Sequence, residues 1–180
     1  MTISIPKRKK RTFQQNEFGC FDLGNACDVL DWIKSEEERL HWSGNTFSKG
    51  LLMNLFKIHH NRSDVYAFAY SKCLIGLKAY GELVVKIKKQ ACLCRIIIKP
   101  ELRNQGIGKY FCDEILRFDR DKTDFLSICL NTFENNLAAR KCYEFLDFRF
   151  FKSRADRRRF DSSILSVTVM KKILPHGKKR

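Results

Sequence analysis

Residues 96–109 read IIIKPELRNQGIGK, and this stretch decides the fold. An apolar run, a proline, a glycine-containing segment and the first apolar positions of a helix follow one another, which predicts a strand, a tight turn and a helix start. Pro100 ends the strand, because it has no N–H to donate to a sheet and favours extended geometry at Lys99. The helix that follows has its apolar side chains on one face, at Ile107, Tyr110, Phe111, Ile115 and Phe118.

The turn has the features of an anion-binding site. Gly106 and Gly108 let the backbone come close to a ligand and adopt angles that other residues avoid. The N–H groups in the first turn of a helix have no intrahelical acceptor and lie at the positive end of the helix dipole, which favours an anion such as pyrophosphate. Arg103 and Lys109 add positive charge at the same place. Because a glycine pair also occurs in ordinary connections, a second signal has to support this interpretation.

On both sides of this stretch the sequence predicts a mixture of strands and helices. Apolar and alternating runs predict strands over residues 17–23, 65–70, 74–85, 91–98, 125–130, 148–151 and 164–170. Apolar residues at helical spacing predict helices over residues 26–33, 51–59, 107–118 and 137–146. Asn25 is a candidate cap for the first of these helices. This order predicts an α/β fold with a mixed sheet.

The second signal is a motif downstream of the turn, Asn136-x-x-Ala139-x-x-x-Tyr143-Glu144-x-x-x-Phe148. With Arg103-x-x-Gly106-x-Gly108, it resembles the GNAT superfamily of acetyl-CoA-dependent N-acetyltransferases. The signatures of that superfamily are Arg/Gln-x-x-Gly-x-Gly/Ala after a strand and a proline, and Asn-x-x-Ala-x-x-x-Tyr-Glu-x-x-Gly-Phe. The two motifs stand in the order of the family, and the resemblance covers residues 65–173. One departure is Asp147, where the family usually has glycine before the aromatic residue.

The resemblance implies a mixed central sheet of about seven strands, splayed between strands 4 and 5 and flanked by about four helices. Acetyl-CoA would enter the gap between those two strands. The pantetheine arm would pair with the backbone of the fourth strand, the loop amides would hold the pyrophosphate, and Asn136 would contact the pantetheine end. The implied cofactor-binding residues are Ile96, Ile97, Ile98, Arg103, Asn104, Gln105, Gly106, Ile107, Gly108, Lys109 and Asn136. No metal is expected.

The implied reaction is transfer of acetyl from acetyl-CoA to a primary amine by direct attack in a ternary complex. Tyr143 would be the general acid that protonates the leaving thiolate, although it also fits a buried helix aromatic, and a backbone N–H of the fourth strand would stabilise the oxyanion. Several protein amino-terminal acetylases of this superfamily have a glutamate five residues before the asparagine. This chain has Asn131 there, which cannot accept a proton at neutral pH. The general base stays unassigned, and the candidates by residue type are Glu82, Glu101, Glu134 and His41.

Composition bounds the remaining expectations. The 180 residues fit one domain, which we expect over 15–174, between basic and flexible tails at 1–14 and 175–180. The sequence shows no signal-peptide pattern and no apolar stretch of membrane-spanning length, and cysteines among strand and helix residues behave as small hydrophobes. Cys92-x-Cys94 lacks a second ligand pair, so zinc is not expected. These features predict a cytoplasmic protein with reduced cysteines.

The charge leaves other functions open. There are 35 Lys and Arg against 20 Asp and Glu, a formal net charge of +15, which favours anionic partners. The acceptor could be a small molecule or a protein, and the chain a monomer or a homodimer. A nucleic-acid-binding protein is a rival interpretation, but the basic residues form no recognition motif. A CoA-binding domain without catalysis is another. The run Arg157-Arg158-Arg159, expected between the last two strands, either recruits an anionic acceptor or forms a solvated turn.

Overall fold

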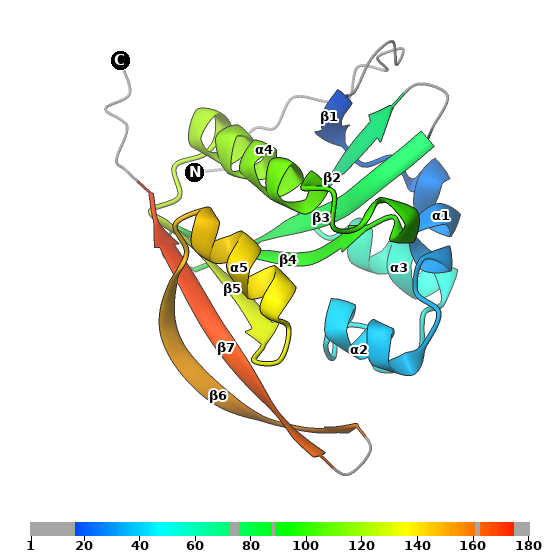
Figure 1. The fold of residues 1–180 in the computed structure, drawn as a ribbon. Helices are drawn as coiled ribbons and strands as arrows, with labels where there is room; N and C mark the ends of the chain where they lie inside the picture. Colours follow the sequence, from blue (N-terminus) through cyan, green and yellow to red (C-terminus); the bar gives the residue numbers. More distant parts are fainter. Residues whose placement is uncertain (1–16, 73–75, 88, 161–162, 175–180) are drawn as a thin grey trace.

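The computed structural model describes residues 17–72, 76–87, 89–160 and 163–174 (Figure 1). The first half contains β1 (Glu17–Cys20), η1 (Leu23–Asn25), α1 (Ala26–Asp31), α2 (Glu36–Ser43), α3 (Met53–His60), β2 (Val65–Lys72), β3 (Gly76–Lys86) and β4 (Gln90–Ile98). The second half contains η2 (Pro100–Leu102), α4 (Ile107–Lys122), β5 (Ser127–Phe133), α5 (Leu137–Phe145), β6 (Arg149–Phe160) and β7 (Ser163–Ile173). Within the described residues, no helix combines the length and the apolar character needed to cross a membrane.

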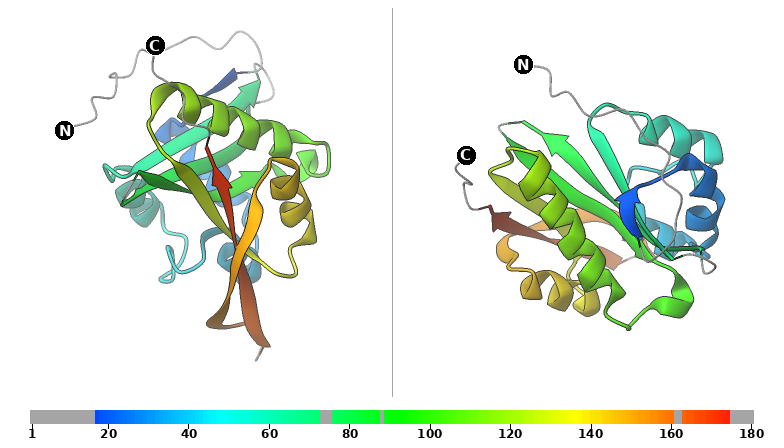
Figure 2. Two further views of the ribbon diagram at one scale, coloured as in Figure 1. Left: turned by 90° about the vertical axis from the view of Figure 1, so that its left-hand side faces the viewer. Right: turned by 90° about the horizontal axis from the view of Figure 1, so that it is seen from above.

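The strands form one seven-stranded mixed sheet in the order β1-β2-β3-β4-β5-β7-β6. The pair β4–β5 is parallel, and every other neighbouring pair is antiparallel. The β6–β7 hairpin extends away from the rest of the sheet (Figures 1 and 2). The α/β fold and the mixed sheet of seven strands predicted from the sequence are confirmed.

Helices cover both faces of the sheet, because successive strand side chains point to opposite faces (Figure 2). On β2, Phe68 packs with α4 residues such as Phe111 and Ile115. The neighbouring Ala67 and Ala69 pack on the other face, with residues of α1 and α3. Two hydrophobic clusters, one on each face, therefore hold the sheet between the two groups of helices.

Three sequence predictions were incomplete or wrong. The described residues contain five α-helices rather than about four, and the missed one is α2. The run Arg154–Arg159 does not connect the last two strands but lies inside β6, with Arg154 opposite Val167 and Arg159 opposite Ile164. Asn25 does not cap α1 with its side chain; Asp22 instead accepts a hydrogen bond from the Gly24 N–H at the preceding turn η1. The basic tails and the predicted strand start at Leu74 lie outside the described residues.

Candidate active site

The two parallel strands of the sheet, β4 and β5, separate after four residue pairs. Their ladder runs from Gln90 opposite Ser127 to Leu93 opposite Leu130. Beyond that point β4 continues to pair with β3, and β5 continues to pair with β7 as far as Phe133. The edge of the last part of β4 that would continue the ladder no longer pairs with β5, and a gap opens there in the middle of the sheet. This is the splay between strands 4 and 5 that was predicted from the sequence.

A β-bulge lies on β4 just where the gap begins. Tyr80 pairs with Ile97 and Glu82 pairs with Cys94, so Gly81 alone faces the two residues between them. Arg95 has a φ of +53°, in the left-handed region that residues with a side chain rarely adopt. A Cβ on Gly81 would lie 2.4 Å from Ile96 Cδ1 and 3.0 Å from Phe111 Cε1, so a larger residue there would force these side chains to move.

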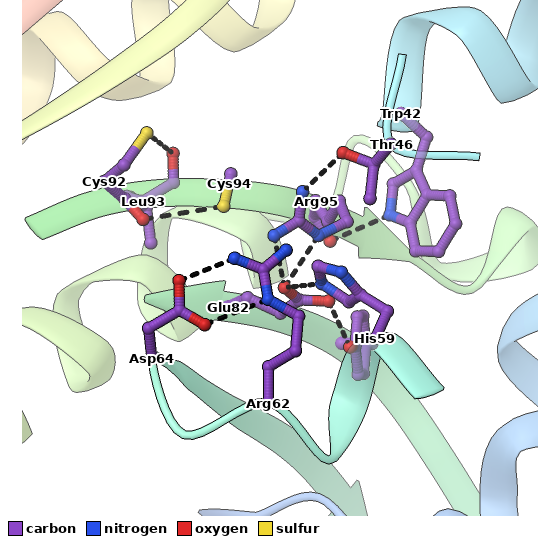
Figure 3. Close-up of polar contacts among 11 residues, drawn as sticks. Trp42, Thr46, His59, Arg62, Asp64, Glu82, Cys92, Leu93, Cys94 and Arg95 are labelled. Carbon is purple, nitrogen blue, oxygen red and sulfur yellow. Dashed lines mark hydrogen bonds and ion pairs between the residues drawn. The ribbon is translucent and has the colours of Figure 1, made fainter. Parts of the chain in front are cut away.

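A buried carboxylate anchors the bulge (Figure 3). Glu82 is 0% exposed, and its Oε2 lies 2.7 Å from Arg95 Nε and 2.9 Å from His59 Nε2. Its Oε1 accepts a hydrogen bond from the Tyr80 hydroxyl at 2.5 Å. Burial by itself raises the pKa of Glu82, but the hydrogen bonds and charges of His59 and Arg95 outweigh it and lower the pKa to about 2. Glu82 is therefore ionised at neutral pH.

Helix α2 and the segment after it hold Arg95 from the other side. Trp42 Nε1 donates a hydrogen bond to the Arg95 carbonyl oxygen at 2.8 Å. The guanidinium of Arg95 donates from Nη1 to Thr46 Oγ1 at 3.1 Å. Both contacts are drawn in Figure 3. The left-handed backbone at Arg95 is thus fixed through its carbonyl and its side chain, as strained residues at functional sites usually are.

A cleft of about 940 Å³ occupies the gap between β4 and β5. Most of the residues implied by the family resemblance lie on its walls: Ile96, Ile97, Ile98, Arg103, Asn104, Gly106, Gly108, Lys109, Asn136 and Tyr143. Two do not contribute to the walls. Gln105 donates from its side chain to the Glu101 carbonyl oxygen at 3.1 Å, and Ile107 packs against the core. For these two, the backbone amide is the group that could face a ligand.

The glycine turn leads directly into α4, a helix of 16 residues. Asn104 and Gly106 have φ values of +60° and +78°, which turn the chain sharply between η2 and the helix. The free amides of the first helical turn lie at the positive end of the dipole, as an anion site requires. Arg103 does not extend into open space: its Nη1 lies 3.4 Å from Glu38 Oε1, and its Nε donates to the Ile98 carbonyl oxygen at 3.3 Å.

Asn136 and Tyr143 stand at the start and in the last turn of α5. The Asn136 Oδ1 accepts a hydrogen bond from the Ala139 N–H at 3.1 Å and so caps the helix. Tyr143 is half-buried in the wall of the cleft. Burial raises the pKa of its hydroxyl well above the ordinary value, and the Cys112 and Cys142 thiols raise it further. The hydroxyl therefore keeps its proton across the physiological range, as a proton donor must.

The structure separates the candidate bases. Glu101 and Glu134 are exposed and do not line the cleft. Glu82 is fully buried and does not line it either. His41 does line the cleft, with its ring 4.8 Å from the ring of Phe133. His59, which the sequence analysis did not single out, lines it as well. No local motif marks His59, because its partner Glu82 is 23 residues away and on another element.

Asn131, on β5, also lines the cleft and is exposed, but an amide cannot act as a base. Among the residues that the structure describes, no group of three or more His, Cys, Asp or Glu side chains is placed to hold a metal ion.

Comparisons with solved structures place this fold among N-acetyltransferases. Spermidine N-acetyltransferase from Vibrio cholerae, in complex with CoA and spermine, is 15% identical over 90% of this chain and 97% of that chain, with a TM-score of 0.76. The ribosomal-protein-S18-alanine N-acetyltransferase from Escherichia coli is 16% identical over 92% and 98%, with a TM-score of 0.67. At these identities the likeness shows the fold. A search of the curated proteins found no significant match.

The sequence itself matches the acetyltransferase (GNAT) family over residues 28–148. That range includes both motifs, the bulged strand β4 and the strand β5 from which it separates. The chain therefore belongs to the acetyltransferase (GNAT) family and is an acyltransferase.

Proposed function

We propose that the protein transfers the acetyl group of acetyl-CoA to a primary amine by direct attack in a ternary complex. The observation that carries this proposal is the separation of β4 from β5 after Leu93 and Leu130, with the glycine turn and Tyr143 both on the walls of the resulting cleft. That arrangement provides a place for the long substrate and a proton donor beside it.

The residues around the cleft fit acetyl-CoA. The end of β4, Ile96 to Ile98, has no partner strand on the β5 side and can pair with an amide-containing arm. The amides of Asn104–Lys109 suit a pyrophosphate. The space beside Gly108 is open, because an added Cβ there would touch only the Ile98 side chain, at 3.7 Å. Lys109 adds a positive charge at the exposed end of this loop. We assign these residues and Asn136 to cofactor binding.

The chemistry follows from these positions. The amine loses a proton, its lone pair forms the C–N bond to the thioester carbonyl carbon, and the C–S bond breaks. The proton of the amine leaves to a base in the cleft or through water. Tyr143 gives its hydroxyl proton to the departing thiolate and regains one from solvent. A backbone N–H at the end of β4 donates to the carbonyl oxygen as negative charge develops there.

The charges along the cleft favour an acceptor with a single positive charge. In the described part of the chain, the charged side chains on its walls are Glu38, Arg62, Lys86, Arg95, Arg103 and Lys109. Glu38, the acid of this set, is engaged by Arg103 and by the Lys34 N–H at 2.7 Å. Arg62 and Arg95 are paired with Asp64 and Glu82, so Lys86 and Lys109 are the wall cations for which no carboxylate partner is found among the described residues. A polyamine would bring several positive charges beside these two lysines, where like charges repel. We therefore propose an acceptor that presents one amine next to neutral or acidic groups.

A screen by mass spectrometry tests both parts of this proposal. Purified protein and acetyl-CoA are incubated with spermidine, an aminoglycoside, and peptides that offer either an amino terminus or a lysine beside acidic residues. We expect acetylation of a peptide or another singly charged amine, and spermidine to be the poorer acceptor. No acetylated product from any amine would contradict the transferase activity, whereas spermidine as the best acceptor would contradict only the charge argument. The cytoplasmic location and the monomer or homodimer state stay predictions.

A further inference from the structure

His59 stands where two hollows of the protein meet. It lines the cleft between β4 and β5, and it also lines a smaller neighbouring cavity of about 310 Å³. Thr46 and Arg62 belong to both as well. The residue is 6% exposed, so a small part of the ring can be reached while the rest is held in the protein. The side chain itself is 7% exposed, and the approach of an amine or a water molecule to the imidazole is part of the inference below.

The orientation of the ring is fixed by Glu82. His59 Nε2 lies 2.9 Å from Glu82 Oε2, and an ionised carboxylate can only accept a hydrogen bond. Nε2 therefore carries a proton, which leaves Nδ1 as the basic nitrogen of a neutral ring. The Phe47 ring packs edge-on against the imidazole, at 5.4 Å between centroids. A carboxylate that holds one ring nitrogen while the other accepts a proton is the arrangement that orients histidine bases in hydrolases.

Charged groups lie around His59 on the elements packed against it. From β3, the Glu82 anion contacts His59 and also accepts a hydrogen bond from the Tyr80 hydroxyl. From β4, the Arg95 cation is paired with the same carboxylate (Figure 3). From the segment after α3, Arg62 approaches, and its guanidinium is paired with Asp64 at 2.6 Å.

On its own helix, His59 is followed by His60, and Lys49 also lines the smaller cavity. Arg62 is paired with Asp64, and the Glu82 carboxylate is shared between Arg95 and the His59 ring.

We infer that His59 is the general base that receives the proton of the attacking amine, and that Glu82 is the residue that positions it. This inference rests on the acetyl transfer proposed above. The amine gives its proton to His59 Nδ1, directly or through one water, as the C–N bond forms. The C–S bond breaks, and the thiolate takes the Tyr143 proton. His59 then releases its proton to solvent. Tyr143 regains a proton from solvent, so that the net change is one proton moved from the amine to the CoA thiol and no other reactant is needed.

His41 is the competing candidate in the same cleft and provides a matched control. The His41 ring packs against Phe133. Among the described residues, no hydrogen bond or ion pair joins it to a carboxylate. We would compare His59→Gln and His41→Gln, since glutamine can still donate a hydrogen bond to Glu82. The measurements are kcat as a function of pH and the Kd for acetyl-CoA. We expect His59→Gln to lower kcat by about 10²–10⁴-fold, to lose the acidic limb of the kcat profile and to bind acetyl-CoA normally, while His41→Gln keeps the limb.

A second measurement does not depend on any variant. Nitrogen-15 NMR of the wild-type imidazoles, assigned for His59, reports which ring nitrogen carries a proton. We expect the neutral Nε2–H form at the pH where kcat reaches its plateau. An imidazolium or the Nδ1–H form at that pH would overturn the assignment, even if His59→Gln fails to fold.

The outcomes separate this inference from the proposed function. An active wild type together with a His59→Gln enzyme of wild-type rate and wild-type acidic limb overturns the base assignment alone. A limb that disappears in His41→Gln but not in His59→Gln assigns the role to His41. A wild type that binds acetyl-CoA but acetylates no amine contradicts the proposed function, and the base assignment falls with it.

Discussion

Asp147 takes the left-handed backbone conformation that the glycine of the family motif would adopt without strain. Its φ is +64°, and the turn it forms ends α5, with the Phe148 N–H donating to the Tyr143 carbonyl oxygen at 3.0 Å. The motif departure therefore changes the residue and keeps the turn. Its carboxylate lies 3.4 Å from Lys172 Nζ, but it is largely exposed, and such pairs contribute little.

Replacing Asp147 by glycine and by alanine isolates the cost of this backbone. Both variants lose the carboxylate, so their difference in unfolding free energy reports the left-handed conformation. We expect Asp147→Gly to be more stable than Asp147→Ala by about 1 kcal/mol, measured by urea denaturation. Equal stability of the two variants would show that the turn is not strained.

Tyr143 has a hydroxyl whose pKa is raised by burial, so it holds its proton at the pH of the reaction. Removing only that hydroxyl in Tyr143→Phe should leave packing and acetyl-CoA affinity unchanged and lower kcat by about 10²–10⁴-fold. Tyr110→Phe, at an exposed tyrosine on α4, is the control and should behave as wild type. If Tyr143→Phe turns over at the wild-type rate, another group protonates the thiolate.

The ionised Glu82 side chain makes the stability of the fold depend on pH in the acid range. Its folded-state pKa of about 2 lies below the ordinary value of 4.5, so its contribution to stability is complete above about pH 4.5 and declines as pH falls toward 2. The shift corresponds to about 3 kcal/mol. Glu82→Gln leaves Arg95 buried without its counter-charge and should cost about 3–5 kcal/mol at pH 7, with a smaller difference from wild type at low pH. Urea denaturation across this range measures it, with Glu101→Gln as the exposed control; a variant as stable as wild type at pH 7 would contradict the account.

At the scale of elements, the sequence predicted the strand–turn–helix around Gly106 because its signals are local: a proline stop, two glycines and one apolar helix face. The sequence analysis missed α2, because the first turn of this helix, Glu36–Glu38, is charged and lacks apolar residues at helical spacing. The cap was nevertheless present, since the Ser35 Oγ accepts from the Glu38 N–H at 3.1 Å. It also ended β6 too early, because the Arg154–Arg159 run lacks the apolar alternation of a strand and pairs with β7 through the backbone.

The glycine turn yields a prediction of its own. Gly108→Glu would place a side chain and a negative charge at the assigned pyrophosphate position, and the room beside Gly108 allows the fold to persist. We expect the affinity for acetyl-CoA to fall at least tenfold (about 1.4 kcal/mol). Gln105→Glu, in the same loop but outside the walls of the cleft, adds the same charge without the obstruction and should have a smaller effect that salt reduces. Calorimetric titration decides; unchanged affinity in a folded Gly108→Glu protein would remove the loop assignment.

For the whole molecule, the fold and the place of the cleft followed from two motifs, whereas the Glu82–Arg95–His59 cluster did not. Those three residues come from β3, β4 and α3, and they meet only because the bulge at Arg95 shifts the β3–β4 register. A register shift of one residue exchanges the two faces of a strand, and no periodicity in the sequence records it. His59, the base inferred above, could not be singled out from the sequence for this reason.

We propose above all that the gap between β4 and β5 holds acetyl-CoA with its thioester beside Tyr143. A crystal structure of the protein with CoA tests it most directly. We predict the pyrophosphate on the amides of residues 104–109, the pantetheine arm along Ile96–Ile98, and the sulfur within hydrogen-bonding reach of the Tyr143 hydroxyl. CoA bound elsewhere on the protein, or bound in the cleft with its sulfur far from Tyr143, would contradict the account.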